Sequence, residues 1–282
     1  MRRRTRECKI GKGDRVTKRD LTPTEQAAMR LWEAASSRKP CAPVRDLIGS
    51  DNIASAYAVQ ELNIAKRVSA GACPVGRKIG MTSAAVQQQL GYYEPNHGTL
   101  FADREASNGE QIPKDRLLQP RAEAEIAFVL RRDLNGEALT IAQVMSAVEY
   151  AVCAIEIIDS RIADWDIRAT DSIADNASCG MYVLGSRPRR ITEVDLTLCG
   201  MVSRLNGQIS SVGVGGASLG NPLLALLWLA RAVAAIGQPL KEADIVLSGA
   251  LGPIVPLSTG DLFETEIDGF GSVRVALTRS DG

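Results

Sequence analysis

The chain has 282 residues, with 33 lysines and arginines against 33 aspartates and glutamates, and 45% of its residues are apolar. This composition is typical of one large soluble domain, and it lacks the net positive charge that nucleic-acid binding proteins carry. The single histidine, His97, excludes zinc sites built from two or more imidazoles, so chemistry must depend on carboxylates, lysine, backbone groups or a bound metal.

The first 75 residues predict a tail followed by helices. Residues 1–20 are rich in arginine and lysine without an apolar segment, which predicts a disordered, solvated tail rather than a secretory signal or a nucleic-acid site. Thr22-Pro23-Thr24-Glu25 has the capping pattern of a helix start, and this helix should end near Ser36. A second helix is expected over residues 53–68, which gives an N-terminal helical region at 21–75.

Residues 76–282 consist of short β-rich runs separated by Gly, Pro and Asn, and they are expected to form the catalytic domain. Strands are predicted at 75–81, 122–130, 152–158 and 181–184, and helices at 83–90, 140–150 and 221–237. Asn206-Gly207 predicts a hairpin, and further strands are expected at 244–247, 261–267 and 272–277. This irregular order excludes a doubly wound sheet and a βα barrel, and no apolar run reaches the ~18 residues of a membrane span.

Three glutamates on two predicted strands are candidate metal ligands. Glu123 and Glu125 are two residues apart, so they lie on one face of their strand, and Glu156 is flanked by apolar residues. Such carboxylates suit Mg²⁺ or Mn²⁺, which leave coordination positions open for water and a chelating substrate. The alternatives are that the first pair forms a solvent-facing stripe and that Glu156 pairs with Arg161 or Arg121.

Lys78 and His97 are the candidate proton-transfer groups. Lys78 lies in an apolar strand bounded by glycines. There it could neutralise a substrate carboxylate or, with a pKa lowered by burial and metal charge, move a proton. The alternative is a surface ion pair. His97 lies in Glu94-Pro95-Asn96-His97-Gly98, which is interpreted as a polar turn. In this turn His97 could act as an acid or base, or it could only make a hydrogen bond within the turn. Residues 171–180 add short polar side chains, and residues 247–253 could offer backbone amides to an anion.

Together these segments resemble the fumarylacetoacetate hydrolase superfamily, and within it the 2-keto-4-pentenoate (2-hydroxypenta-2,4-dienoate) hydratases of aromatic-compound degradation, with 4-oxalocrotonate decarboxylases as close relatives. The likeness covers residues 54–277 and is strongest at 76–82, 95–101, 119–130, 156–165, 175–180 and 248–253. It implies an α+β fold, a mixed β-sandwich roll with an N-terminal helical cap. It also implies a divalent metal, Mg²⁺ or Mn²⁺, held by Glu123, Glu125 and Glu156, with Lys78 in the active site and Ser178 at a substrate-contacting position.

The chain departs from this family at one turn. These hydratases typically read Pro-Asp-Phe/Tyr-Gly there, whereas this chain has Pro95-Asn96-His97-Gly98, so a neutral amide replaces the expected carboxylate. Asn96 cannot act as a base. Either His97 takes over proton transfer, the aspartate of the family only positions other groups, or the substrate and chemistry differ.

The resemblance predicts a lyase that hydrates a 2-hydroxy-2,4-dienoate to a 4-hydroxy-2-oxo acid, with the metal chelating the C1 carboxylate and the C2 oxygen. The alternatives are decarboxylation of a 2-oxo diacid, hydrolysis of a C–C bond, or a catalytically lapsed subunit. Six cysteines without a C-x-x-C pair favour a reduced, cytoplasmic protein. The apolar late strands and the 223–236 helix favour a homo-oligomer, and a partner enzyme of the same pathway is a further possibility, whereas membrane and nucleic-acid partners are not expected.

Overall fold

Two β-sheets and a layer of helices make up the structure, a computed structural model that describes residues 21–279. The tail predicted at 1–20 lies outside the described residues. The helices are α1 (Pro23–Ser37), α2 (Arg45–Ile48), α3 (Ile53–Ser69), α4 (Ala84–Leu90), α5 (Ile141–Ala147), α6 (Ala169–Ala174) and α7 (Pro222–Ala235). The strands are β1 (Pro74–Gly80), β2 (Asn96–Phe101), β3 (Glu105–Ala106), β4 (Gln111–Pro113), β5 (Pro120–Leu130), β6 (Val148–Asp159), β7 (Cys179–Leu184), β8 (Gly200–Leu205), β9 (Gln208–Val214), β10 (Ile245–Leu247), β11 (Val255–Pro256), β12 (Leu262–Ile267) and β13 (Gly271–Thr278).

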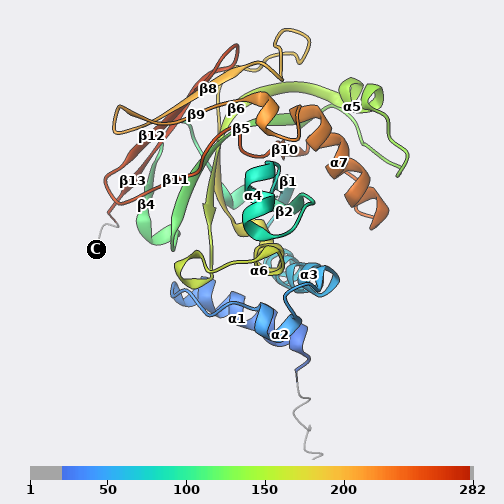
Figure 1. Ribbon diagram of the computed structural model, residues 1–282, viewed down its shortest axis with the longest axis vertical. Helices are drawn as coiled ribbons and strands as arrows, with labels where there is room; N and C mark the ends of the chain where they lie inside the picture. Colours follow the sequence, from blue (N-terminus) through green and yellow to red (C-terminus); the bar gives the residue numbers. More distant parts are fainter. Residues whose placement is uncertain (1–20, 280–282) are drawn as a thin grey trace, which may run out of the picture.

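The larger sheet has eight strands and carries all the predicted site residues except Ser178, which lies in the turn before β7. Its order is β2-β1-β10-β5-β6-β7-β3, with β11 paired to β5, and both parallel and antiparallel pairs occur. Strands β5 and β6 are long and antiparallel, and their register places Glu123 directly opposite Glu156. Figure 1 shows these two strands curving across one end of the molecule, with α4, β1, β2 and α6 below them and α1 to α3 at the other end.

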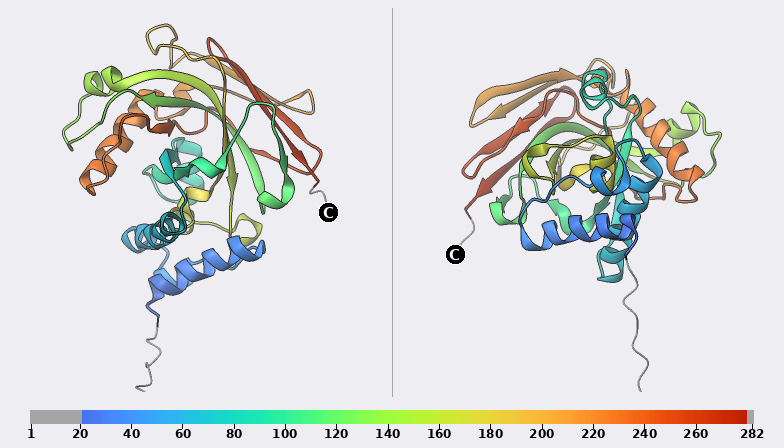
Figure 2. Two further views of the ribbon diagram at one scale, coloured as in Figure 1. Left: turned by 180° about the vertical axis from the view of Figure 1, so that it is seen from behind. Right: turned by 60° about the horizontal axis from the view of Figure 1, so that its bottom comes forward.

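The smaller sheet, in the order β4-β13-β12-β8-β9, covers one face of the larger sheet and forms the main core with it. Seen from behind (Figure 2), its C-terminal strands and helices α1 to α3 lie at opposite ends of the molecule. This arrangement confirms the predicted α+β fold with two packed sheets. The β8–β9 hairpin is also confirmed, because Asn206 and Gly207 both adopt the positive φ that a tight hairpin turn requires.

Helix α7 belongs to this core. In the described part of the chain, the stretch Gly215–Ala235 is long and apolar enough to cross a membrane by composition. Its α-helical part has only 14 residues, about 21 Å against the ~30 Å of a bilayer core. Leu226, Leu229 and Val233 are fully buried in the main core. Packing against the sheets therefore accounts for the apolar sequence of this helix.

Two local predictions were wrong, and a short helix was missed. The helix expected at 140–150 ends at Ala147, because the β-branched and aromatic residues from Val148 onward extend strand β6. The short helix α2 was not predicted. The segment interpreted as a polar turn is instead strand β2, in which every residue from Asn96 to Phe101 is buried.

Helices α1 to α3 pack on the later chain through a second apolar cluster. Helix α1 begins with the predicted capping box at Thr22 and Glu25, and its buried face meets Ile162 and Ile173. A buried carboxylate, Asp171, ties the two parts together by accepting hydrogen bonds from the backbone amides of Val44, Arg45 and Arg168. The arrangement of the helices therefore depends on a charged group inside the protein.

The two aspartates that bind Arg45 should differ sharply in their contribution to stability. Asp171 is fully buried and lies 2.6 Å from the Arg45 guanidinium, whereas Asp166 is 64% exposed and lies 2.8 Å from it. We expect Asp171→Ala to lower the free energy of unfolding by about 3 kcal/mol, because it leaves the backbone amides of Val44, Arg45 and Arg168 without an acceptor and removes the buried partner of the Arg45 guanidinium. Asp166→Ala is the matched control and should cost less than about 1 kcal/mol. Urea unfolding measures both, and equal losses would contradict this account.

Candidate metal and substrate site

Glu123, Glu125 and Glu156 converge on the concave face of the larger sheet, opposite the main core. One carboxylate oxygen from each lies within 4.8 Å of the others, and all three side chains are buried. Glu125 accepts a 2.7 Å hydrogen bond from the Gly249 amide, so one amide of residues 247–253 is used by a side chain of the protein itself. The other oxygen of Glu125 and Oε1 of Glu156 have no hydrogen-bond partner among the described residues, and Glu156 Oε2 has only the Lys78 ammonium group, 3.2 Å away. The prediction of a solvent-facing glutamate stripe is therefore wrong.

The charge balance of this cluster calls for a cation. Burial first, and then the charge of Glu156, raises the pKa of Glu123 to about 7, and burial with both neighbouring carboxylates raises the pKa of Glu125 well above its usual range. Burial also raises the pKa of Glu156, although Lys78 opposes this effect. Three carboxylates face one ammonium group, and a divalent cation would restore neutrality. Buried, unpaired carboxylate oxygens are the ligands that hard divalent cations prefer, so these residues fit such an ion.

Lys78 is the positive partner of Glu156. Its Nζ lies 3.2 Å from Glu156 Oε2 and donates a 3.0 Å hydrogen bond to the Ala177 carbonyl, and its side chain is 3% exposed. The alternatives that Glu156 pairs with Arg161 or Arg121, and that Lys78 forms a surface ion pair, are therefore wrong. Burial lowers the pKa of Lys78, but the charges of Glu156, Glu123 and Glu125 outweigh it and raise that pKa. Without a metal the lysine is thus held charged, and the lowering predicted from burial together with metal charge stays a prediction for the metal-bound protein.

A left-handed turn brings Ser178 to the same pocket. Asn176, Ala177 and Ser178 all have φ between +52° and +55°, a conformation that residues other than glycine rarely adopt in succession. Asn176 holds the turn against β2, since its side chain accepts from the Thr99 amide and donates to the Thr99 carbonyl. A Cβ at Gly98 would lie 2.4 Å from the Asn176 carbonyl, so only glycine allows this approach. The Ser178 hydroxyl is buried without a hydrogen-bond partner among the described residues.

Asn96 reaches this pocket, and His97 does not. Because they are successive residues of β2, their side chains lie on opposite faces. Asn96 donates a 3.3 Å hydrogen bond to the Ser172 hydroxyl. The His97 ring stacks on Tyr57, 4.8 Å between centroids, and Trp228 of α7 lies on a further side at 6.4 Å. The structure therefore corrects the prediction that His97 is a catalytic residue.

Burial and the nearby Arg77 lower the pKa of His97 from 6.5 to about 3. Between pH 6.5 and about 3, the His97 side chain is protonated in the unfolded chain but not in the folded chain. The free energy of unfolding therefore falls as the pH falls through this window. We expect His97→Phe to remove about 2 kcal/mol of the stability difference between pH 7 and pH 5. Urea unfolding at both pH values measures this effect. The variant should also keep kcat within about threefold, and a loss of 100-fold would restore His97 to the reaction.

A pocket of about 180 Å³ is lined by Lys78, Asn96, Glu123 and Ser178, and its lining also includes Arg121 and Trp165, which were not predicted as site residues. Arg121 lies on β5 two residues before Glu123, and its guanidinium stacks over the Trp165 ring at 4.2 Å. Both side chains line the pocket with Lys78, Asn96 and Ser178. The two-residue spacing could have indicated Arg121, because it places that side chain on the face of the glutamates. Nothing in the sequence pairs it with Trp165.

Comparison with known proteins identifies the family. A family model for the C-terminal region of fumarylacetoacetate (FAA) hydrolase matches residues 82–278. The chain belongs to the fumarylacetoacetate hydrolase family. This match covers the three glutamates, Asn96 and Ser178, and it confirms the resemblance inferred from the sequence. Lys78 lies four residues before the matched region.

Within the fumarylacetoacetate hydrolase family, the chain is similar to curated hydratases over most of its length. It is 54% identical to a TodF product hydratase of Pseudomonas putida, covering 90% of this chain and 95% of that protein. It is 51% identical to a 2-keto-4-pentenoate hydratase of Paraburkholderia xenovorans, with the same coverage. Among solved structures, a 4-oxalocrotonate decarboxylase from Pseudomonas putida complexed with magnesium and adipate has a TM-score of 0.84 and 30% identity, covering 92% of this chain and all of that one.

Proposed function

We propose that this protein is a hydro-lyase that adds water to a 2-hydroxy-2,4-dienoate of the 2-keto-4-pentenoate type and forms a 4-hydroxy-2-oxo acid in aromatic-compound catabolism. Its similarity to curated hydratases, at 54% and 51% identity over 90% of the chain, supports this reaction. The observation that carries the proposal is the cluster of buried, unpaired carboxylate oxygens beside the ammonium group of Lys78.

Glu123, Glu125 and Glu156 would hold a divalent cation, for which we propose Mg²⁺ or Mn²⁺. When bound, the ion supplies positive charge beside the oxygens of a 2-oxo acid and stabilises the enolate-like charge that develops there. The similar decarboxylase structures contain magnesium in one case and calcium in another, which supports a hard divalent cation in this protein. The Gly249 amide fixes Glu125, so the ligand set is oriented by the backbone.

The residues of the chain bind and orient the substrate. The Lys78 ammonium group, held by Glu156 and the Ala177 carbonyl, places a positive charge and a proton donor in the pocket. The Ser178 hydroxyl and the Asn96 amide oxygen have no protein partner among the described residues, so both are available to the substrate or to water. As a neutral amide Asn96 orients groups and takes no proton, so proton transfer rests on Lys78.

The reaction consists of two proton-balanced steps. First the 2-hydroxydienoate becomes the 2-oxo-3-enoate, as the O2 proton leaves and a proton is added at C5. Then water adds across the C3–C4 double bond, with hydroxide bonding to C4 and a proton to C3. Lys78 can donate a proton and take one back within the pocket, and Arg121 with Trp165 forms the wall toward which the substrate's C4–C5 end is proposed to extend.

Product analysis tests this function. Purified protein, 2-hydroxypenta-2,4-dienoate and Mg²⁺ should yield a product heavier than the substrate by one water, with the hydroxyl group at C4 by NMR. The fold similarity to a decarboxylase, at a TM-score of 0.85, favours decarboxylation of a 2-oxo diacid as the second candidate. Release of CO₂ from 4-oxalocrotonate, together with no hydration of the dienoate, would replace our proposal with that reaction.

We also propose a cytoplasmic homo-oligomer, with residues 76–282 as the catalytic domain and residues 21–75 as a helical cap. The edge strand β9 exposes Ile209 at 67% and Val212 at 59%, and Leu198 nearby along the chain is 73% exposed. Exposed apolar side chains on an edge strand support association with another copy. All five described cysteines are free thiols, which is consistent with a reducing compartment. A partner enzyme of the same pathway stays a prediction.

A further inference from the structure

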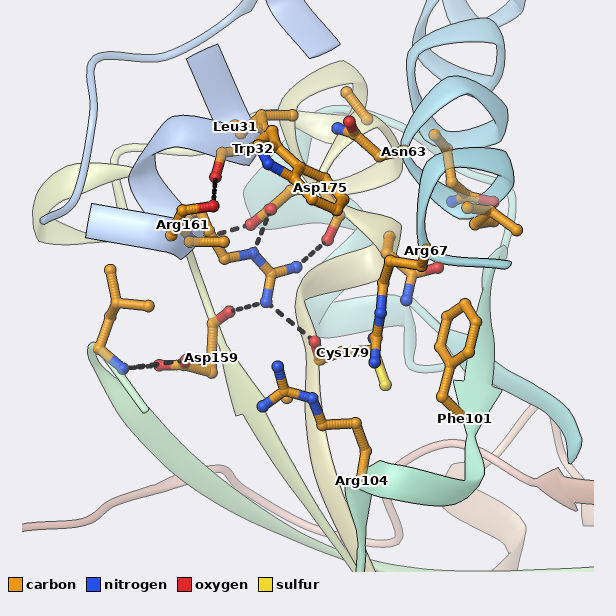
Figure 3. Close-up of a pocket in the computed structure, with 18 of the residues that line it drawn as sticks. Leu31, Trp32, Asn63, Arg67, Phe101, Arg104, Asp159, Arg161, Asp175 and Cys179 are labelled. Atoms are coloured by element: carbon orange, nitrogen blue, oxygen red, sulfur yellow. Dashed lines mark hydrogen bonds and ion pairs between the residues drawn. The ribbon is translucent and has the colours of Figure 1, made fainter. Parts of the chain in front are cut away.

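A second cavity, of about 340 Å³, lies between helices α1 and α3 and the larger sheet (Figure 3). It shares no lining residue with the pocket at the three glutamates. The left-handed turn and its flanks separate the two cavities, because Asn176 and Cys179 line the larger one while Ala177 and Ser178 line the other. The proposed reaction uses none of the side chains of this second cavity.

Four arginines line the second cavity, and their positive charge exceeds the charge of its two aspartates. The lining arginines are Arg67, Arg104, Arg116 and Arg161, and the lining aspartates are Asp159 and Asp175. Both aspartates are already engaged, Asp159 by the amides of residues 118 and 119 and Asp175 by the Arg161 guanidinium. The cavity therefore carries uncompensated positive charge.

Arg104 has the least compensated of these guanidinium groups. Its nearest carboxylate, that of Asp103, lies 3.8 Å away, and the same carboxylate accepts two 2.8 Å hydrogen bonds from Arg67. Arg104 makes no hydrogen bond through its guanidinium to any described residue, and the side chain is 35% exposed. Burial and the charges of Arg67, Arg161 and Arg116 lower its pKa, as expected for a crowded cation. Figure 3 shows Arg104 and Arg161 directed toward the same space.

Apolar side chains also line the cavity, although Lys66 stacks over the Trp32 ring and Arg67 over the Phe101 ring, each at 3.9 Å. Leu31, Trp32 and Ile64 come from helices α1 and α3, and Phe101 comes from the end of β2. A guanidinium group presents parallel N–H donors that match a carboxylate, and aromatic rings favour a flat apolar body. A ligand that pairs with the guanidinium groups and also contacts the apolar side chains is an organic anion and not an inorganic one. The volume of the cavity is in the range of small-molecule pockets.

We propose that this cavity is a binding site for a small organic carboxylate, anchored by Arg104, with its apolar part against the half-buried side chains of Trp32 and Ile64. The site is separate from the active site and independent of the reaction assigned to it. Its ligand enters between the helical cap and the sheet, from the side lined by Arg104, Arg116 and Asp103.

Titration calorimetry with benzoate tests the proposal on the full chain, with Mg²⁺ and oxalate added to occupy the active site. Benzoate should bind the unmodified protein, and Arg104→Met should weaken it at least about tenfold. Arg274→Met, which removes an exposed arginine of β13, is the matched control and should leave the affinity unchanged. The neutral analogue benzamide should bind much more weakly than benzoate. Circular dichroism melting shows whether Arg104→Met is folded, and Arg104→Lys provides a second, milder variant with intermediate affinity.

Three results would overturn the proposal: no benzoate binding at millimolar concentration, equal affinity in the folded Arg104→Met variant, or benzoate binding that oxalate abolishes. Inorganic phosphate that binds as tightly as benzoate would overturn the assignment to an organic carboxylate. Because calorimetry measures no turnover, an absence of hydratase activity would leave this result untouched. The failure of one proposal is therefore distinguishable from the failure of the other.

Discussion

Glu123→Ala is expected to lose divalent metal binding and hydration together. The variant removes one of three buried carboxylates whose oxygens lie within 4.8 Å of each other. Among the described residues, no carboxylate besides Glu123 lines the pocket of about 180 Å³, so none there can replace it. Metal affinity should fall by about 100-fold or more, and kcat by about 10²–10³-fold at metal concentrations that saturate the unmodified protein. Titration calorimetry with Mg²⁺ and a dienoate absorbance assay measure the two effects.

Glu149→Ala is the matched control, because Glu149 lies on the same strand as Glu156 but is exposed. It should keep both metal affinity and kcat. Normal metal affinity in Glu123→Ala would remove this residue from the ligand set, and normal turnover without metal would refute the metal-dependent reaction.

Lys78→Met is expected to separate metal binding from turnover. The change removes the charged partner of Glu156 and the proton donor of the pocket, so kcat should fall by about 10²–10⁴-fold. Metal should bind at least as tightly as before, because a positive charge that repels the cation has been removed. Without metal the variant should lose about 3 kcal/mol of unfolding free energy, since Glu156 is left buried and unpaired, and saturating Mg²⁺ should restore stability.

Lys241→Met controls for the loss of a lysine, because this side chain is 57% exposed and pairs with Asp133 at the surface. Its kcat and unfolding free energy should stay close to those of the unmodified protein. Retained kcat in Lys78→Met would exclude the lysine from proton transfer. Loss of metal affinity in that variant would show that its effect on turnover is indirect.

The cluster of three glutamates could be predicted because it depends on local periodicity. The spacing of Glu123 and Glu125 fixes their common face, and a buried Glu156 needs a partner wherever the strand lies. The partner itself could not be predicted. Lys78 reaches Glu156 through the order β1-β10-β5-β6, which joins segments far apart in the sequence.

His97 shows how polar residues can mislead. The run from Glu94 to Gly98 has the composition of a turn, but it enters a buried strand because distant groups satisfy its backbone and side chains. Gln60 donates to the His97 carbonyl, and Tyr57 stacks on the His97 ring. These partners come from helix α3, so sequence reasoning about the strand alone could not have supplied them.

The arginine-lined cavity was likewise beyond local patterns. Its lining comes from α1, α3, the segment around residues 101–118 and the turn at 174–180, and each arginine taken alone is an ordinary surface residue. Only the packing of the helical layer on the sheet brings their charges together.

The most direct test of a metal-dependent hydratase is a dienoate absorbance assay. The protein is first treated with a chelator, and the rate at which the ultraviolet absorbance of 2-hydroxypenta-2,4-dienoate is lost is then measured against Mg²⁺ concentration. We expect no enzymatic rate in the chelator-treated protein, a saturable recovery of the rate as Mg²⁺ is added, and no release of CO₂. A rate that resists the chelator, or CO₂ released in step with the absorbance loss, would contradict a metal-dependent hydratase built on Glu123, Glu125 and Glu156.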